Sequence, residues 1–364
     1  MKLPTYEEFR REPEQLDVLE YPRDRSLFVA GPPGSGKTVL AVTRASDAAR
    51  LHKQPAPLVT YNRMLRRLLS LIKDDPRVQP RTMHSFVYRH YTNATGREPP
   101  GTPQDPYDFR WSDMLKRMAE MERQPNLQHL VVDEAQSLPA GFFRYASRCC
   151  ARTMSIFADE DQTLDDQRTT LEEIKNAVGL DDPMLLSRNH RNTPEIARLA
   201  EHFHSGRLPA AEVKRMPTGD RPRLIQCGLP ETIERVSNWI RTRGGSIGIV
   251  VHANDTGRKL HQQLAEKLKS RRVNLYSHEQ RNEDSVNMLE EGITILNAKS
   301  AKGQEFDAVF ILELERFVPC RTATQKRVMY MLCTRARDML FLIHHRQLSP
   351  AAAAALPGLD LLEP

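Results

Sequence analysis

The chain has 364 residues, of which 39% are hydrophobic and 27% charged, and its formal net charge is +6. This length predicts about two domains of roughly 150 residues each, and the composition excludes a disordered chain. No apolar run reaches the ~18 to 20 residues of a membrane-spanning helix, and Lys2, Glu7, Glu8 and Arg10 interrupt any signal-peptide core. We therefore expect a cytoplasmic protein with no membrane partner. Its charge alone fits an ordinary soluble surface as well as a nucleic-acid groove.

Short apolar runs alternate with amphipathic segments along the chain. The expected strands are residues 26–30, 57–60, 127–132, 153–158, 247–251, 292–296 and 308–312. The expected helices are residues 38–51, 62–72, 193–203 and 255–268. This alternation predicts an α/β fold in which parallel sheets are flanked by helices. We expect a first domain over 1–185, a second over 186–350 and a C-terminal tail over 351–364, with the boundary placed at the turn sequence GLDDP.

Two further features limit the interpretation. Residues 98–107, EPPGTPQDPY, contain four prolines and a glycine and predict a surface loop. The five cysteines are odd in number and show no C-x-x-C spacing, so they predict reduced, mostly buried thiols rather than a disulfide framework or a zinc site. These cysteines are Cys149, Cys150, Cys227, Cys320 and Cys333.

The sequence GPPGSGKT fits the phosphate-binding pattern G-x-x-x-x-G-K-[ST] and lies between an expected strand and an expected helix. We expect its backbone N–H groups and the Lys37 ammonium to bind ATP phosphates, and the Thr38 hydroxyl to bind Mg²⁺. The alternative, a chance match in a glycine turn, does not explain the flanking elements. The residues of this loop are Gly31, Pro32, Pro33, Gly34, Ser35, Gly36, Lys37 and Thr38.

An acidic pair follows the expected strand 127–132. The carboxyl ends of parallel strands meet at one edge of a sheet, so Asp133 and Glu134 would lie beside the phosphate loop. Asp133 would hold Mg²⁺, and Glu134 would polarise the water that attacks the γ-phosphate. An Asp-Glu pair after a strand is commonplace and often only caps a helix. It supports an ATP site here because Lys37 of the phosphate loop is present as well.

Several ordered motifs resemble those of superfamily 1 helicases of the UvrD/Rep branch. VVDEAQ and FADEDQ resemble motifs II and III, LVTYNRML resembles motif Ia, and TMHSF resembles the adjoining DNA-contacting motif. LLSRNHRNTPEI, TILNAKSAKGQEFDAVFIL and MYMLCTRARD resemble motifs IV, V and VI. The resemblance covers most of the chain. It implies two tandem RecA-like domains with ATP bound between them, and single-stranded nucleic acid as the partner. We expect this strand to be DNA, and RNA stays open.

The resemblance also implies residue roles. Gln162, Arg191 and Arg335 would act on the γ-phosphate, the two arginines being offered by the second domain. Gln15 would read adenine, Arg44 and His190 would stack on the base, with histidine standing where the family has tyrosine, and Glu305 would contact the ribose. The residues expected to contact nucleic acid are Thr60, Tyr61, Asn62, Thr82, His84, Phe86, Lys299 and Ser300.

Three departures from the family pattern shape the expected function. Only about 45 residues separate Phe86 from the second motif and about 100 separate the fourth motif from the fifth, so large accessory insertions do not fit. Asp165 and Gln167 stand where the family has aromatic residues, and Asn297 and Lys299 replace its threonine and histidine. We expect an ATP-dependent translocase or weak helicase. If it translocates, the resemblance implies 3′ to 5′ movement along single-stranded DNA, and it also implies a role in DNA repair or antiviral defence. Two alternatives stay open: an ATP-gated module that regulates a protein partner such as a nuclease, and a degenerate, slowly hydrolysing nucleotide binder.

Overall fold

The computed structural model describes residues 5–159, 169–206, 209–276, 283, 286 and 289–364. The chain divides into two compact units. Of the described residues, unit 1 comprises 5–31, 36–159 and 169–187, and unit 2 comprises 32–35 and those from 188 onward. In the described part of the chain, no helix combines the length and the apolar character needed to cross a membrane.

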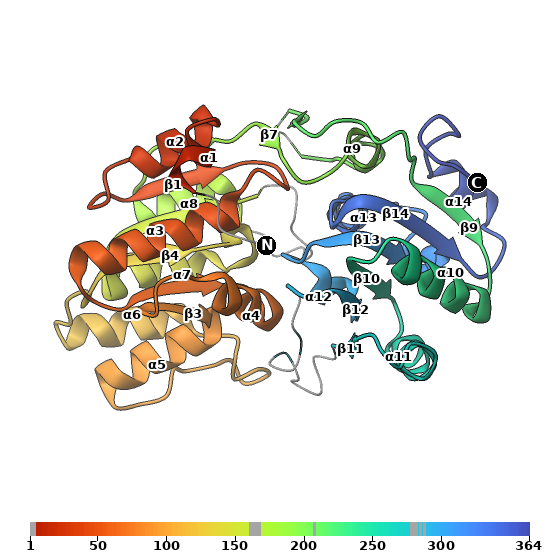
Figure 1. The fold of residues 1–364 in the computed structure, drawn as a ribbon. Coiled ribbons are helices and arrows are strands. Elements are labelled where there is room, and N and C mark those ends of the chain that lie inside the picture. The colour runs from red at the N-terminus through yellow and green to blue at the C-terminus, as the bar shows by residue number, and fades with distance from the viewer. Residues whose placement is uncertain (1–4, 160–168, 207–208, 277–282, 284–285, 287–288) are drawn as a thin grey trace. The chain divides into compact units, whose positions relative to one another are not determined.

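Unit 1 is built on a parallel six-stranded sheet, coloured red to yellow-green in Figure 1. The strand order is β3-β2-β4-β5-β1-β6, and every neighbouring pair is parallel. The central strands are buried along almost their whole length because helices cover both faces of such a sheet. The strands are β1 (Leu27–Ala30), β2 (Ala56–Thr60), β3 (Val78–Thr82), β4 (Leu127–Val132), β5 (Ala151–Ala158) and β6 (Met184–Leu185).

Two helices that follow neighbouring strands of unit 1, α4 and α5, begin where the local sequence supplies a cap. The Asn62 side chain accepts a hydrogen bond from the Leu65 N–H (2.7 Å) and starts α4, and the Thr82 hydroxyl accepts one from the Ser85 N–H (3.4 Å) and starts α5. The helices are α1 (Tyr6–Phe9), α2 (Pro13–Glu20), α3 (Lys37–His52), α4 (Arg63–Ile72), α5 (Met83–Thr95), α6 (Trp111–Glu120), α7 (Ala140–Tyr145) and α8 (Leu171–Val178), with a 3₁₀ turn at Ala135–Ser137 and a π turn at Ala146–Cys150.

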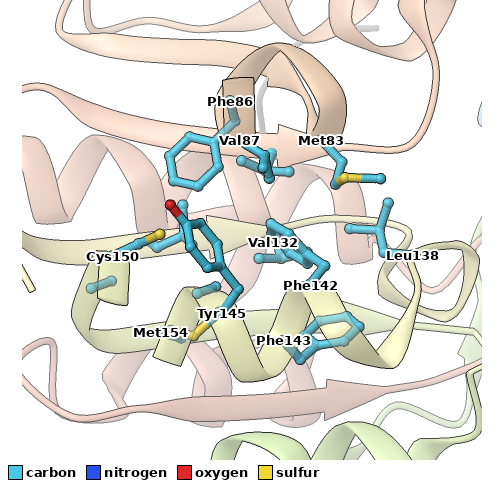
Figure 2. Close-up of a cluster of buried hydrophobic side chains, with 14 of the residues drawn as sticks. Met83, Phe86, Val87, Val132, Leu138, Phe142, Phe143, Tyr145, Cys150 and Met154 are labelled. Atoms are coloured by element: carbon cyan, nitrogen blue, oxygen red, sulfur yellow. The ribbon is translucent and has the colours of Figure 1, made fainter. Parts of the chain in front are cut away.

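An aromatic-rich core lies between α5, α7 and the sheet. Figure 2 shows Phe86 and Val87 of α5 beside Tyr145 of α7 and Val132 of β4. The ring centroids of Phe86 and Phe142 are 6.4 Å apart at an edge-to-face angle of 79°. This packing fixes α5 on the sheet and turns the side chain of Phe86 inward.

Unit 2 repeats the same architecture with the strand order β11-β12-β10-β13-β14-β9, again all parallel. Its strands are β9 (Arg223–Gln226), β10 (Ser246–Val251), β11 (Val273–Leu275), β12 (Gly292–Asn297), β13 (Phe306–Ile311) and β14 (Ala336–His344), with a small parallel pair of β7 (Arg188–Asn189) and β8 (Glu212–Val213). Its helices are α9 (Pro194–Glu201), α10 (Leu229–Thr242), α11 (Asn254–Lys267), α12 (Ala298–Ala301), α13 (Ala323–Cys333) and α14 (Pro350–Ala354), with a 3₁₀ turn at Leu314–Arg316.

The predicted fold class is confirmed: both units are parallel, helix-flanked α/β domains of the RecA-like kind. All seven expected strands occur, with ends displaced by at most two residues. The C-terminal tail packs on unit 2, since Leu362 is buried and the Leu224 N–H donates to the Glu363 carbonyl at 2.7 Å. The five cysteines form no disulfide; four are buried and Cys320 is half-buried. The domain boundary near residue 185 stays a prediction.

Candidate nucleotide site and nucleic-acid face

The phosphate loop joins β1 to α3 in a conformation that needs glycine. Gly34 and Gly36 have φ angles of +77° and +89°, a region that favours residues without a Cβ. Lys37 is buried at the start of α3, where its Nζ donates to the Gly31 carbonyl at 2.7 Å and lies 3.3 Å from Asp159 Oδ2. The ammonium is therefore folded back over the loop, and its binding of terminal phosphates stays a prediction.

Asp133 follows β4 with one carboxylate oxygen unsatisfied. Its Oδ1 accepts the Glu134 N–H at 3.0 Å, whereas the buried Oδ2 has no hydrogen-bond partner among the described residues. Burial, and then the neighbouring charge of Glu134, raise the pKa of Asp133 to about 7, and the Thr38 side chain opposes this rise. A buried, orphaned carboxylate oxygen beside a hydroxyl fits Mg²⁺, which typically takes one or two protein ligands plus water and phosphate oxygens. The described residues contain no cluster of three or more His, Cys, Asp or Glu that could hold a metal by itself.

Glu134 is oriented by a residue that the sequence analysis did not place in the site. Gln136 is buried; its Nε2 donates to Glu134 Oε2 at 2.8 Å, and its Oε1 accepts the Asp159 N–H at 2.9 Å. Asp159 in turn pairs with Lys37. Lys37, Asp159, Gln136 and Glu134 thus form one connected polar chain. The only sequence signal was that Gln136 and Asp159 belong to the two helicase-like motifs.

Gln15 lies against the phosphate loop. A Cβ at Gly36 would come within 2.7 Å of the Gln15 Nε2, so the loop and the amide of α2 are in close contact. An amide carries both a donor and an acceptor, which is what recognition of an adenine edge requires. Adenine reading by Gln15 stays a prediction, and the structure brings this residue, which lies 16 positions before Gly31, into contact with the loop.

Arg44 requires a correction. Its side chain is only 2% exposed, and its guanidinium donates to the carbonyls of Tyr21 (2.7 Å) and Pro22 (3.2 Å) and to the Ser155 hydroxyl (3.4 Å). Stacking on a base would cost all three hydrogen bonds. The guanidinium instead ties the segment before β1 to β5. The sequence showed a charged residue on α3 but could not show that it faces the interior.

Replacing this guanidinium is expected to destabilise unit 1. Arg44→Met keeps much of the side-chain volume but leaves the partly buried carbonyls of Tyr21 and Pro22 without their donor. We expect the free energy of unfolding in urea to fall by about 2 to 4 kcal/mol. Arg123→Met, at an exposed position of the same unit, is the matched control and should change stability little. Unchanged stability of Arg44→Met together with altered base preference would restore the stacking role.

The arginines of unit 2 have different environments. Arg191 is half-buried; its Nη2 pairs with Glu305 Oε1 at 2.6 Å, and its Nη1 donates to the Thr334 carbonyl at 3.4 Å. Burial alone would raise the pKa of Glu305, but the charge and hydrogen bond of Arg191 bring it below its ordinary value. Glu305, expected to contact a ribose, is therefore an ion-pair partner of Arg191 in this structure.

Arg335 is not presented at the surface of unit 2. It is 1% exposed, and its guanidinium donates to the carbonyls of Met331 (2.9 Å) and Gln304 (3.2 Å) and to the Thr334 hydroxyl (3.1 Å). The expectation that Arg335 is offered freely to a phosphate is corrected on this point, because the interior acceptors already hold it.

His190 is half-buried between β7 and α9. Gln162, Asp165 and Gln167 lie outside the described residues.

The residues expected to contact nucleic acid divide into two groups. Thr60 and Thr82 are register partners at the carboxyl ends of β2 and β3, so the caps Asn62 and Thr82 start neighbouring helices at one edge of the sheet. Thr82, Asn62, His84 and Tyr61 keep partial exposure there, although Tyr61 also packs against the core.

Three of these expectations are corrected by burial. Thr60 and Ser300 are buried, and Phe86 belongs to the core of Figure 2, so none of them presents a side chain to a ligand. Lys299, on α12 beside Ser300, is exposed. The reason is local. A strand turns every second side chain inward and an α-helix about every third or fourth, and the residue types of a motif do not show which positions these are.

Comparison with known proteins adds two family matches. Residues 22–164 match the family described as AAA domain, and residues 249–347 match the family described as UvrD-like helicase C-terminal domain. A search of the curated proteins gives no match. Among solved structures, the C-terminal domain of a possible DNA helicase from Lactobacillus is 20% identical, with 48% of this chain and 96% of that chain covered and a TM-score of 0.34. Pif1 helicase from Candida albicans is 11% identical, with 96% of each chain covered and a TM-score of 0.48.

Proposed function

We propose that this ATP-hydrolysing, helicase-like enzyme is a minimal translocase or weak helicase of the UvrD/Rep type, which uses ATP and Mg²⁺ to move along single-stranded DNA. The AAA match over the phosphate loop and the UvrD-like match over the second unit support this function. The observation that carries it is the polar chain from Lys37 to Glu134 at the carboxyl edge of the unit 1 sheet. The 3′ to 5′ direction and a role in DNA repair or antiviral defence rest on the motif resemblance.

The residues of unit 1 divide the chemistry among them. The loop amides and the Lys37 ammonium bind the phosphates, and Lys37 would exchange its contact with Asp159 for a phosphate oxygen. Thr38 and Asp133 would hold Mg²⁺, which when bound neutralises part of the phosphate charge. Glu134, held by Gln136, orients and deprotonates the attacking water. Gln15 fixes the base end of the nucleotide.

Unit 2 would supply positive charge to the transferred phosphate. We assign this role first to Arg191, because its ion pair with Glu305 is half-buried and can be exchanged for a phosphate. Arg335 would contact the phosphate only after its interior hydrogen bonds rearrange. Alternatively, it would position Arg191 indirectly, because Arg335 binds the Thr334 hydroxyl and Arg191 binds the Thr334 carbonyl. We also propose that the chain divides into two domains near residue 185, so that both arginines belong to the second domain.

Single-stranded nucleic acid would pass the helix starts at Asn62 and Thr82 in unit 1 and Lys299 in unit 2. Helix N-termini present backbone N–H groups and a partial positive charge, which suit phosphate oxygens. These contacts are independent of base sequence, as translocation along a strand requires.

The test is the ATPase rate with and without single-stranded DNA. We expect the strand to stimulate hydrolysis by the wild type, and Lys37→Ala to lower the stimulated rate by about 10²-fold or more. Lys116→Ala, an exposed lysine of unit 1, is the matched control. A rate that ignores DNA and survives Lys37→Ala would exclude this function. ATP-dependent but DNA-independent capture of a nuclease would favour the interaction-module alternative.

A further inference from the structure

We infer that β3, α5 and the connection from α5 to α6 together carry a second contact surface for single-stranded nucleic acid, in which Tyr88 and Tyr107 stack on bases and Arg81 and Arg89 hold phosphates. The inference rests on the proposed function, since it deepens the nucleic-acid binding of unit 1. None of these four residues belongs to a helicase-like motif. The helices α5 and α6 are labelled in Figure 1.

Tyr107 and Tyr88 are two exposed aromatic side chains on the surface of unit 1. Tyr107 is 58% exposed and Tyr88 is 40% exposed. The two phenols are close enough to interact electrostatically, and the Tyr88 hydroxyl donates to Glu98. Exposed aromatic rings offer a face to any base, so they bind single strands without sequence preference.

The proline-rich loop holds Tyr107 in a defined place. Gly101 and Phe109 form an antiparallel bridge, and the Arg110 N–H donates to the Pro100 carbonyl at 2.9 Å. The Tyr107 N–H donates to Asp105 Oδ1 at 2.8 Å. Phe109 is buried and meets Trp111 edge to face at 5.4 Å. A ring presented by such a braced loop loses little conformational freedom on binding.

Arg81 and Arg89 supply positive charge without a carboxylate partner. In the described part of the chain neither forms an ion pair, and the one side-chain hydrogen bond of Arg81 goes to the Gln79 amide at 3.3 Å. Burial and then the charge of Arg89 lower the pKa of Arg81, so the two guanidinium groups repel each other. A phosphate between them would relieve this repulsion.

The surface is continuous with the predicted strand path. The His84 ring lies edge to face with Tyr107 at 5.9 Å, and His84 follows the helix start at Thr82. From there the exposed positions Ser85, Tyr88 and Arg89 follow one face of α5. The nearby carboxylates of Glu98 and Asp105 are already engaged by Tyr88 and the Tyr107 backbone. Tyr107 thus supplies, from another element, an aromatic surface that the sequence lacks at Asp165 and Gln167.

The experiment measures binding of a fluorescent 20-nucleotide oligo(dT) to the full chain by anisotropy over a range of salt concentrations. Tyr107→Ala is expected to weaken binding about tenfold without changing the slope of log affinity against log salt, whereas Tyr107→Phe should bind like the wild type. Arg89→Ala is expected to weaken binding and to reduce that slope by about one phosphate contact. Arg123→Ala, exposed in the same unit, is the matched control, and thermal melting of each variant confirms folding.

The outcomes separate this inference from the proposed function. Wild-type chain that does not bind the oligonucleotide overturns both. Wild-type binding that Tyr107→Ala and Arg89→Ala leave unchanged overturns only the second surface. Equal losses in Tyr107→Ala and Tyr107→Phe would also overturn it, because the hydroxyl rather than the ring face would then make the contact.

Discussion

Glu134→Gln is expected to lower kcat for ATP hydrolysis by about 10²- to 10⁴-fold while nucleotide affinity stays close to that of the wild type. The amide keeps the length of the side chain and can still meet Gln136, but it cannot take a proton from water. Glu134 has a φ angle of +56° and lies just before the 3₁₀ turn at Ala135–Ser137. The Gln136 side chain donates to one of its carboxylate oxygens at 2.8 Å. Single-turnover hydrolysis and equilibrium binding of a fluorescent nucleotide measure the two quantities separately.

The control for this prediction is Glu172→Gln, an exposed glutamate in the first turn of α8. It removes the same charge from unit 1 and should leave kcat unchanged. If Glu134→Gln hydrolysed ATP at nearly the wild-type rate, the base would have to be another residue. Gln136 would then have no role in orienting the base. If the variant lost nucleotide binding instead, Glu134 would act on the bound ground state rather than on the water.

The strands that were predictable are those whose apolar side chains face helices on both sides. β1 is an example: its four residues, Leu27–Ala30, are all apolar and all buried, because a strand inside a parallel sheet has no solvent face. β3 reads VQPRT, contains a proline, and was missed. It is an edge strand paired only with β2, where a missing donor and polar side chains are tolerated.

The parts of the candidate site that could be predicted are those whose functional residues are consecutive in the sequence. The phosphate loop and the Asp133-Glu134 pair each form a short motif on one turn of chain, so the sequence placed them beside each other. Gln136 and Asp159 were missed as partners because their contact joins the ends of two strands, β4 and β5. Arg44, Arg335 and Phe86 were misjudged for the opposite reason: a motif gives the residue type, but tertiary packing decides whether its side chain is buried.

The two arginines of unit 2 are expected to respond differently to truncation. Arg191→Ala should lower kcat by about 10³-fold and change the free energy of unfolding by only about 1 to 2 kcal/mol, because its side chain is partly solvated and loses one ion pair with Glu305. Arg335→Ala should lower the free energy of unfolding by about 3 kcal/mol or more, because the carbonyls of Met331 and Gln304 lose their donors inside the unit.

Measuring kcat and urea unfolding for both variants, with Arg241→Ala on the exposed face of α10 as the matched control, separates a charge that acts on phosphate from one that supports the fold. Arg191→Lys is a further test. Its ammonium keeps the positive charge but cannot make the bidentate contact of a guanidinium, so its kcat should lie between those of Arg191→Ala and the wild type. Loss of stability without loss of kcat in Arg335→Ala would give that residue a purely structural role. The reverse result would mean that its buried guanidinium leaves Met331 and Gln304 when ATP binds, and that Arg335 joins Arg191 on the transferred phosphate.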